Sequence, residues 1–165
     1  MRDSLLAAGG NLDTTVGGTL MEVMNRTYAT GGNAPPDVVK KMHYDTPRRS
    51  VYLPVVRNSL YGPFAAFDFP EPGTVTGQRS QTTVAPQALF LMNSPFMKHQ
   101  GKLLSERVAL SAPTPEKRIF AVFRQVYGRT PSSEEVASAQ AFVESDGWAA
   151  LCHTMLMTNE FLYVR

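Results

Sequence analysis

The sequence predicts a mainly α-helical protein, in which an irregular, loop-rich N-terminal half packs on an antiparallel bundle of four to five helices. From residue 84 on, helix-start signals recur and apolar residues follow helical spacing. The first half is interrupted by loop-forming stretches such as GGNLDTTVGG and TGGNAPPD. With 165 residues and 43% apolar content, the chain can bury one core. We therefore expect residues 1–83 to complete the core of a bundle formed by residues 84–165, together one domain fragment.

A short helix is expected at the start of the chain, over residues 2–8. Leu5 and Leu6 would face the core, and the pair Gly9-Gly10 would end the helix. The opening residues lack the basic stretch and the apolar run of a signal peptide. A chain that opens inside an apolar helix resembles the interior of a longer domain, so we expect truncation at the N-terminus.

Residues 48–83 are expected to be extended or irregular. The apolar residues of RRSVYLPVVRN favour extended structure, but Pro54 cannot donate a ladder hydrogen bond, which predicts a short edge strand near 50–56 or an extended crossing. Residues 60–83 form a long loop with one helical turn at PFAAFD. Its aromatic residues either pin the loop to the core or line a pocket; they are Tyr61, Phe64, Phe67 and Phe69.

The helices of the second half are predicted from their starts and ends. The first covers residues 84–93, and the second follows Ser94 as N-cap with proline at its first position. The third repeats this device at Thr114 and ends at Gly128. The fourth has a capping box, formed by Ser132 and Glu135.

Two apolar stripes assign faces to the later helices. In the third helix the stripe consists of Ile119, Val122, Phe123, Val126 and Tyr127. The last helix should start near Asp146, and its stripe consists of Trp148, Leu151, Cys152, Met155, Leu156 and Asn159. The final residues EFLYVR form either a further turn or an extended tail.

The stretch AALCH at residues 149–153 matches two of the three defining residues of the c-type haem signature C-x-x-C-H. Ala149 stands where the first cysteine would be. Cys152 lies in the middle of the apolar stripe, where a free cysteine packs as a small hydrophobe. His153 points about 100° away around the helix. We favour a core cysteine beside a rim histidine over a reduced haem site, and expect no haem and no other cofactor in this segment.

Other familiar sites are not indicated. A single cysteine excludes an internal disulfide and a cysteine-rich zinc or iron–sulfur site. His43 and His99 have no second ligand at helical spacing, so no metal site is expected. The net charge of +2 gives no argument for nucleic acid, and no apolar run is long enough to span a membrane.

A set of polar side chains between residues 48 and 93 is the candidate ligand-binding site. Its members are Arg57, Asn58, Asp68, Arg79, Thr82, Thr83, Gln87 and Asn93. Gln87 falls in the first turn of a helix, where free backbone N–H groups favour anions, and Arg79 adds a forked donor for carboxylate, sulfate or sugar hydroxyls. The alternative is structural: Arg57, Asp68 and Arg79 tie the loop to the bundle, and Asn93 joins two helices.

Five blocks, in this order, carry a resemblance to a known family: RRSVYLPVVRN, FDFPEP, GQRSQTTVAPQALFLMNSPF, YGRTPSSEEV and WAALCHTMLMTNEFLYVR. The chain resembles the C-terminal part of planctomycete-specific domain one, a large domain of unknown function. This resemblance implies an exported multidomain protein, periplasmic or at the cell surface. It also implies that c-type cytochrome and other domains of the same protein are partners, with a glycan as a further candidate. It implies no catalytic residue.

Three functional hypotheses follow. The first is a ligand- or partner-binding module of such a cytochrome-linked protein. The second is part of an enzyme acting on polysaccharide, with Asp68 and Glu71 as acid and base candidates. The third is a structural cap of a larger domain, which predicts an exposed apolar surface along residues 5–24. We rank the first and third above the second.

Overall fold

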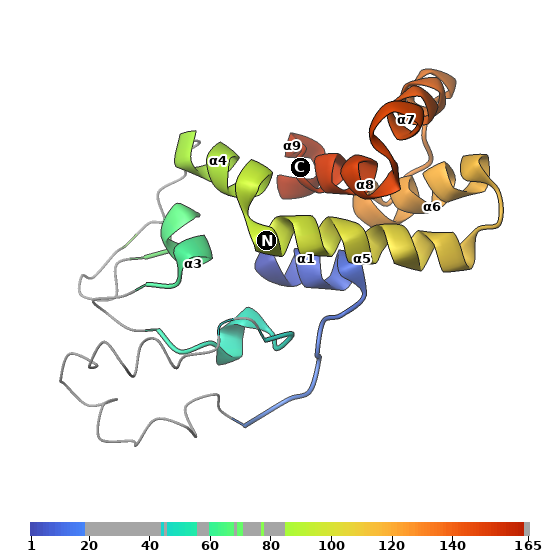
Figure 1. The fold of residues 1–165 in the computed structure, drawn as a ribbon. Coiled ribbons are helices and arrows are strands. Elements are labelled where there is room, and N and C mark those ends of the chain that lie inside the picture. The colour runs from blue at the N-terminus through green and yellow to red at the C-terminus, as the bar shows by residue number, and fades with distance from the viewer. Residues whose placement is uncertain are drawn as a thin grey trace, which may run out of the picture. The chain divides into compact units, whose positions relative to one another are not determined.

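The computed structural model describes residues 1–18, 44, 46–55, 60–67, 69–70, 77 and 85–163. Within these residues the protein is mainly helical, as predicted, with eight α-helices, one 3-10 turn and no strand (Figure 1). The chain divides into two compact units. Met1–Asn11 and Ala88–Arg165 make up what we call the helical unit, and Leu12–Gln87 make up the loop unit.

The first helix, α1 (Arg2–Gly9), belongs to the helical unit although some 80 residues separate it from the next part of that unit. Leu5 and Leu6 are 0% and 2% exposed, and Gly10 ends the helix in the left-handed conformation, as predicted. The helix packs along α5 (Pro95–Ser111) (Figure 1). The structural-cap hypothesis predicts an exposed apolar surface along residues 5–24, and this prediction is wrong for Leu5 and Leu6. Residues 19–24 lie outside the described residues.

The helices α4 (Ala85–Asn93), α5 and α6 (Pro115–Tyr127) follow the predicted pattern. Thr114 caps α6 by accepting a hydrogen bond from the Lys117 backbone N–H, and Gly128 ends it at φ 71°. Ser94 precedes the proline of α5 as expected, but its side chain makes no capping hydrogen bond. The predicted α6 stripe is confirmed for Ile119, Val122, Phe123 and Val126, which are all buried, whereas its fifth member, Tyr127, is half-buried.

The chain closes with α7 (Ser133–Asp146), α8 (Trp148–Leu156) and the single turn α9 (Asn159–Leu162). The predicted capping box of α7 is present in both directions. In Figure 1, α8 runs along α5, and these two helices share the most extensive contact of the helical unit. The contact is close because Gly101 of α5 faces α8: a Cβ at this position would lie 2.9 Å from the Cα of His153.

The loop unit contains α3 (Gly62–Ala66), which confirms the helical turn predicted there, and the 3-10 turn Ser50–Tyr52. The expected edge strand is thus a turn over its first three residues. The N–H groups of Tyr52 and Leu53 donate to the carbonyls of Arg49 and Ser50, so neither is directed to a partner strand. Val51 and Val55 are 73% and 44% exposed while Leu53 is buried, so the segment lacks the continuous buried face that fixes a strand.

Four of the described aromatic residues of the loop unit pack on one another. Tyr61 stacks on Tyr44 with ring centroids 4.5 Å apart and meets Phe64 edge-on at 5.4 Å. Phe64 in turn stacks on Phe69 at 4.9 Å. Such pairs contribute about 0.5–1.5 kcal/mol each beyond their buried area. Three of the four predicted aromatic residues therefore stabilise the loop unit by local packing.

Candidate binding groove

The polar set predicted from the sequence is only partly within the described residues. Those outside are Arg57, Asn58, Asp68, Arg79, Thr82 and Thr83, together with Glu71 of the enzymatic hypothesis. Gln87 and Asn93 are described, and both lie on α4. Gln87 is 5% exposed, whereas Asn93 is exposed and donates to the Leu89 carbonyl of its own helix at 3.1 Å. Asn93 therefore does not make the expected link between two helices through this bond.

Cys152 and His153 have separate roles within the bundle. Cys152 is 0% exposed, and burial raises the pKa of its thiol to about 12. The Nε2 atom of His153 lies 2.9 Å from the carbonyl oxygen of Leu91. A carbonyl only accepts, so Nε2 carries the proton and the ring joins α8 to α4. The interpretation of Cys152 as a core cysteine is confirmed.

This burial predicts that Cys152 resists alkylation in the folded chain. Only the thiolate reacts, and a thiol with a pKa of about 12 is ionised at pH 8 to roughly one part in 10,000. We expect iodoacetamide at pH 8 to label Cys152 only as fast as the helical unit opens, and to label urea-unfolded chain at the rate of a free thiol. Labelling of the folded chain at that free-thiol rate would contradict the buried position.

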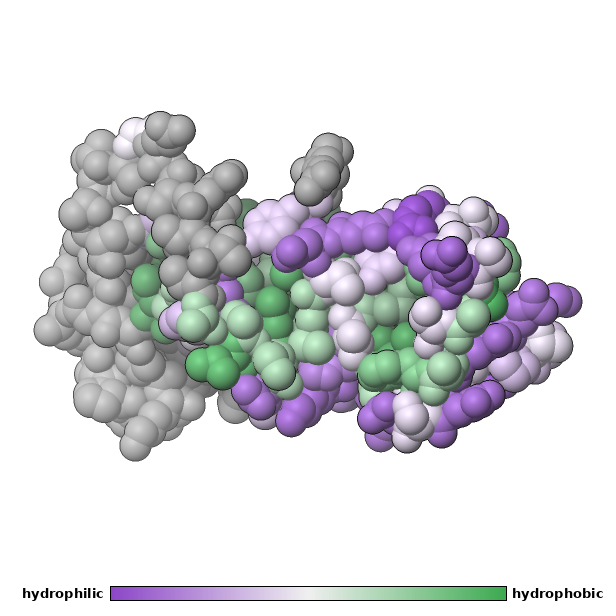
Figure 2. Space-filling view, turned by 90° about the horizontal axis from the view of Figure 1, so that it is seen from above, coloured by the Kyte–Doolittle hydropathy of each residue, from purple (hydrophilic) through white to green (hydrophobic). Residues whose placement is uncertain are grey.

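Apolar side chains reach the surface of the helical unit at several points. Leu89 and Met92 of α4 are 59% and 57% exposed, and Leu110 of α5 is 91% exposed. Figure 2 shows apolar patches bordered by hydrophilic residues on one face of the described part. Exposed leucines are normal on soluble proteins and carry no functional argument by themselves. Binding sites are typically concave surfaces with a defined chemistry.

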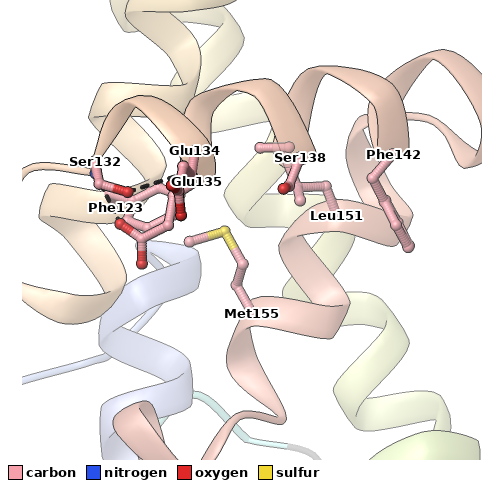
Figure 3. Close-up of a pocket in the computed structure, with 9 residues that line it drawn as sticks. Phe123, Ser132, Glu134, Glu135, Ser138, Phe142, Leu151 and Met155 are labelled. Atoms are coloured by element: carbon pink, nitrogen blue, oxygen red, sulfur yellow. Dashed lines mark hydrogen bonds between the residues drawn. The ribbon is translucent and has the colours of Figure 1, made fainter.

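Such a surface lies between α6, α7 and α8, where a groove of about 680 Å³ opens to solvent. Its floor is apolar and consists of Phe123, Ala139, Phe142, Leu151 and Met155. Its polar rim consists of Ser132, the N-cap of α7, and of Glu134, Glu135 and Ser138 from the first half of that helix. Figure 3 shows Met155 reaching from α8 toward α7, with the two glutamates at one end of the groove and Phe142 at the other.

A three-residue ion cluster fixes the acidic end of the groove. Arg129, just after α6, forms a two-pronged pair with Glu135 at 2.7 and 2.8 Å. The same guanidinium binds Glu160 of α9 at 2.6 and 2.9 Å. Hydrogen bonds from Arg129 hold the pKa of Glu135 at about 2 and lower that of Glu160. Both carboxylates are charged at neutral pH, and they share one cation.

Local sequence explains the position of each member of this cluster. Gly128 turns the chain at the end of α6 and is followed directly by Arg129. The capping box holds Glu135 at the start of α7, where the Ser132 N–H donates to it at 2.8 Å. Thr158 caps α9 by accepting from the Phe161 N–H, which positions the turn that carries Glu160. The capping signal predicted Glu135, but no local signal indicates the pairing of Arg129 with Glu160, which lie 31 residues apart.

The groove combines an apolar floor with carboxylates and hydroxyls at its rim. Among the described residues, no group of three or more His, Cys, Asp or Glu side chains is arranged to hold a metal ion. The helices in the described ranges are all too short or too polar to cross a bilayer. Glu135 is held ionised by Arg129, which makes it a poor proton donor near neutral pH.

Comparison with known proteins identifies a family. No curated protein and no solved structure matches the chain. The family PSD1, described as a protein of unknown function (DUF1553), matches residues 1–143. This range includes the blocks RRSVYLPVVRN, GQRSQTTVAPQALFLMNSPF and YGRTPSSEEV and ends before the block that contains Cys152. Because most of its length is matched, the chain belongs to the PSD1 family of proteins of unknown function (DUF1553).

Proposed function

We propose that this chain is a partner-binding module of a longer exported protein, and that the groove between α6, α7 and α8 is its binding site. The observation that carries the proposal is the groove itself, about 680 Å³ with an apolar floor and an acidic end. The setting of the module comes from the resemblance to planctomycete-specific domain one. It is the periplasm or the cell surface, with c-type cytochrome domains in the same protein.

The shape of the groove favours a protein segment over a small molecule. Small-molecule sites commonly enclose 70–90% of their ligand. Here the α7 side is open, because Ser132, Glu134 and Ser138 are exposed, and Phe142 on the floor is only half-buried. A ligand lying here would remain largely in water, whereas a partner's surface would cover both the groove and its rim. Most of the floor is already buried, so the water removed on binding would come mainly from Phe142, the rim and the partner's own apolar side chains.

The partner's apolar side chains set the scale of the expected affinity, because most of the floor is already buried in the free chain. Each large apolar side chain that becomes fully buried contributes about 1.5–3 kcal/mol. Two or three such anchors contribute about 3–9 kcal/mol before the costs of association are subtracted. Binding near −8 kcal/mol corresponds to a dissociation constant of about 1 μM. We therefore expect micromolar or weaker binding by this module alone.

The enzymatic hypothesis has less support. Its acid and base candidates, Asp68 and Glu71, lie outside the described residues. The carboxylates of the groove do not replace them, since Glu134 and Glu135 are adjacent on one helix and Glu135 is engaged by Arg129. A glycoside hydrolase needs two carboxyls on opposite sides of a bond. The polar set around Arg57 and Arg79 stays a separate proposal for ligand binding.

The proposal is tested by filling the groove. Short random peptides displayed on phage are selected against the whole chain, and the synthetic peptides are titrated calorimetrically. Ser138→Trp places a large ring in the groove from an exposed position, so we expect binding to weaken by about tenfold or more, which is about 1.4 kcal/mol. The matched control is Gln140→Trp, on the same helix but outside the groove lining, with an expected change within about twofold.

Two outcomes would contradict the proposal. If Ser138→Trp and wild type bind the selected peptides equally, the peptides bind elsewhere and the groove is not the site. If selection on wild type enriches no peptide that competes for one site, the groove lacks the affinity expected of a partner-binding surface. Thermal melts of both tryptophan variants check that each is folded before titration.

A further inference from the structure

We infer that the partner segment carries a lysine or arginine beside its apolar anchors, and that this cation binds at the Glu134 end of the groove. This inference rests on the proposed function and adds the charge and the direction of the partner. Three observations support it. They are the hydrogen bonds of Arg129, the exposure of Glu134, and the length of α7 between the acidic and apolar ends of the groove.

Arg129 cannot serve as an anion site, because all five of its N–H donors are engaged. Its Nε donates to Glu160, and its Nη2 donates to Glu135 and Glu160. Its Nη1 donates to Glu135 and to the Thr130 carbonyl at 3.2 Å. A guanidinium has five such donors, so none is left for a phosphate or carboxylate of a ligand. An acidic partner would have to break an existing bond.

The carboxylates at the acidic end of the groove, unlike Arg129, leave charge available to a partner. Glu135 and Glu160 share one guanidinium, so the cluster retains negative charge at neutral pH. Glu134, next to this cluster and part of the groove lining, is exposed and forms no ion pair with any residue in the described ranges. A partner's ammonium or guanidinium group can bind Glu134 without displacing an existing contact. Charge complementarity therefore favours a basic segment.

The length of α7 sets the direction and spacing of that segment. Figure 3 shows the glutamates and Phe142 at opposite ends of the groove. Eight residues separate Glu134 from Phe142, which is about 12 Å along a helix. An extended partner covers this distance with about four residues, and a helical partner with about two turns. We expect the basic residue and the anchor over Phe142 to be separated by this spacing.

The test combines variants of the protein with variants of the selected peptides. The predicted cation is replaced by glutamine in the synthetic peptide, and the full chain carries Glu134→Gln. The control is Glu144→Gln, an exposed glutamate on the same helix that does not line the groove. We expect Glu134→Gln to weaken binding by about two- to fivefold, and the glutamine peptide to abolish this difference. Raising NaCl from roughly 0.05 to 0.5 M should also reduce it.

The outcomes separate this inference from the proposed function. Two results would leave the groove as the binding site but contradict a basic partner. In the first, Ser138→Trp weakens binding but Glu134→Gln does not; in the second, the selected peptides carry no lysine or arginine. If Ser138→Trp has no effect, both proposals fail. If the chain self-associates in sedimentation velocity and Ser138→Trp abolishes this, the occupant is a second copy and the inference is overturned.

Discussion

Replacing Leu5 by alanine is expected to lower the free energy of unfolding of the helical unit by about 2–5 kcal/mol. Leu5 is completely buried in α1, which packs on α5. The substitution removes the side chain beyond Cβ and leaves a cavity that the surrounding helices cannot fully close. Arg107 adds to this junction by donating from Nη1 to the Ala7 and Ala8 carbonyls at 3.0 and 3.3 Å. Urea denaturation followed by circular dichroism measures the loss.

The matched control is Leu110→Ala, since Leu110 is 91% exposed on α5. This substitution should change stability by less than about 0.5 kcal/mol. If Leu5→Ala and Leu110→Ala have equally small effects, α1 does not belong to the core of the helical unit. The comparison thus tests whether the first residues of the chain fold with helices that begin some 80 residues later.

Gly101→Ala is expected to destabilise the helical unit by about 1–3 kcal/mol, despite the better helix propensity of alanine. A Cβ at position 101 would lie 2.8 Å from the Cβ, 2.9 Å from the Cα and 3.0 Å from the backbone N of His153. These atoms are fixed to the α8 backbone, so α5 and α8 must separate to admit the methyl group. In an open helix the same change would gain about 1 kcal/mol.

Gly62→Ala is the control for this effect, because nothing lies within 4 Å of a Cβ at that position and its φ is not positive. We expect a change within about 0.5 kcal/mol, or a small gain. A stabilising Gly101→Ala would show that α8 lies further from α5 than the structure has it. A larger effect of Gly101→Val than of Gly101→Ala would support a steric cause.

The helices of the second half were predictable because their signals are local. Thr114 and Gly128 bound α6 as expected, and the capping box at Ser132 and Glu135 starts α7. The packing of α1 on α5 was not predictable in its particulars, since periodicity shows that Leu5 is buried but not against which helix. Extended propensity gave a wrong prediction at Ser50–Tyr52, where the backbone hydrogen bonds close a turn and do not join a strand.

The candidate site was less predictable than the fold. The polar set chosen from the sequence lies mostly outside the described residues, and its two described members occupy different faces of α4. The groove arises where three helices meet. Helical periodicity does not distinguish the apolar residues of its floor from residues of the core. Of the polar rim, only Ser132 and Glu135 carried a local signal, the capping box. The pairing of Arg129 with Glu160 depends on the arrangement of α7 and α9, which no single segment specifies.

The most direct test of the central claim is hydrogen exchange of the full chain with and without a saturating selected peptide. Binding in the groove predicts slower exchange at residues 132–142 of α7 and 151–156 of α8, with α1 unchanged. Protection confined to residues 44–70, or no change in α7 and α8 while the peptide is bound, would contradict the assignment of this groove as the binding site.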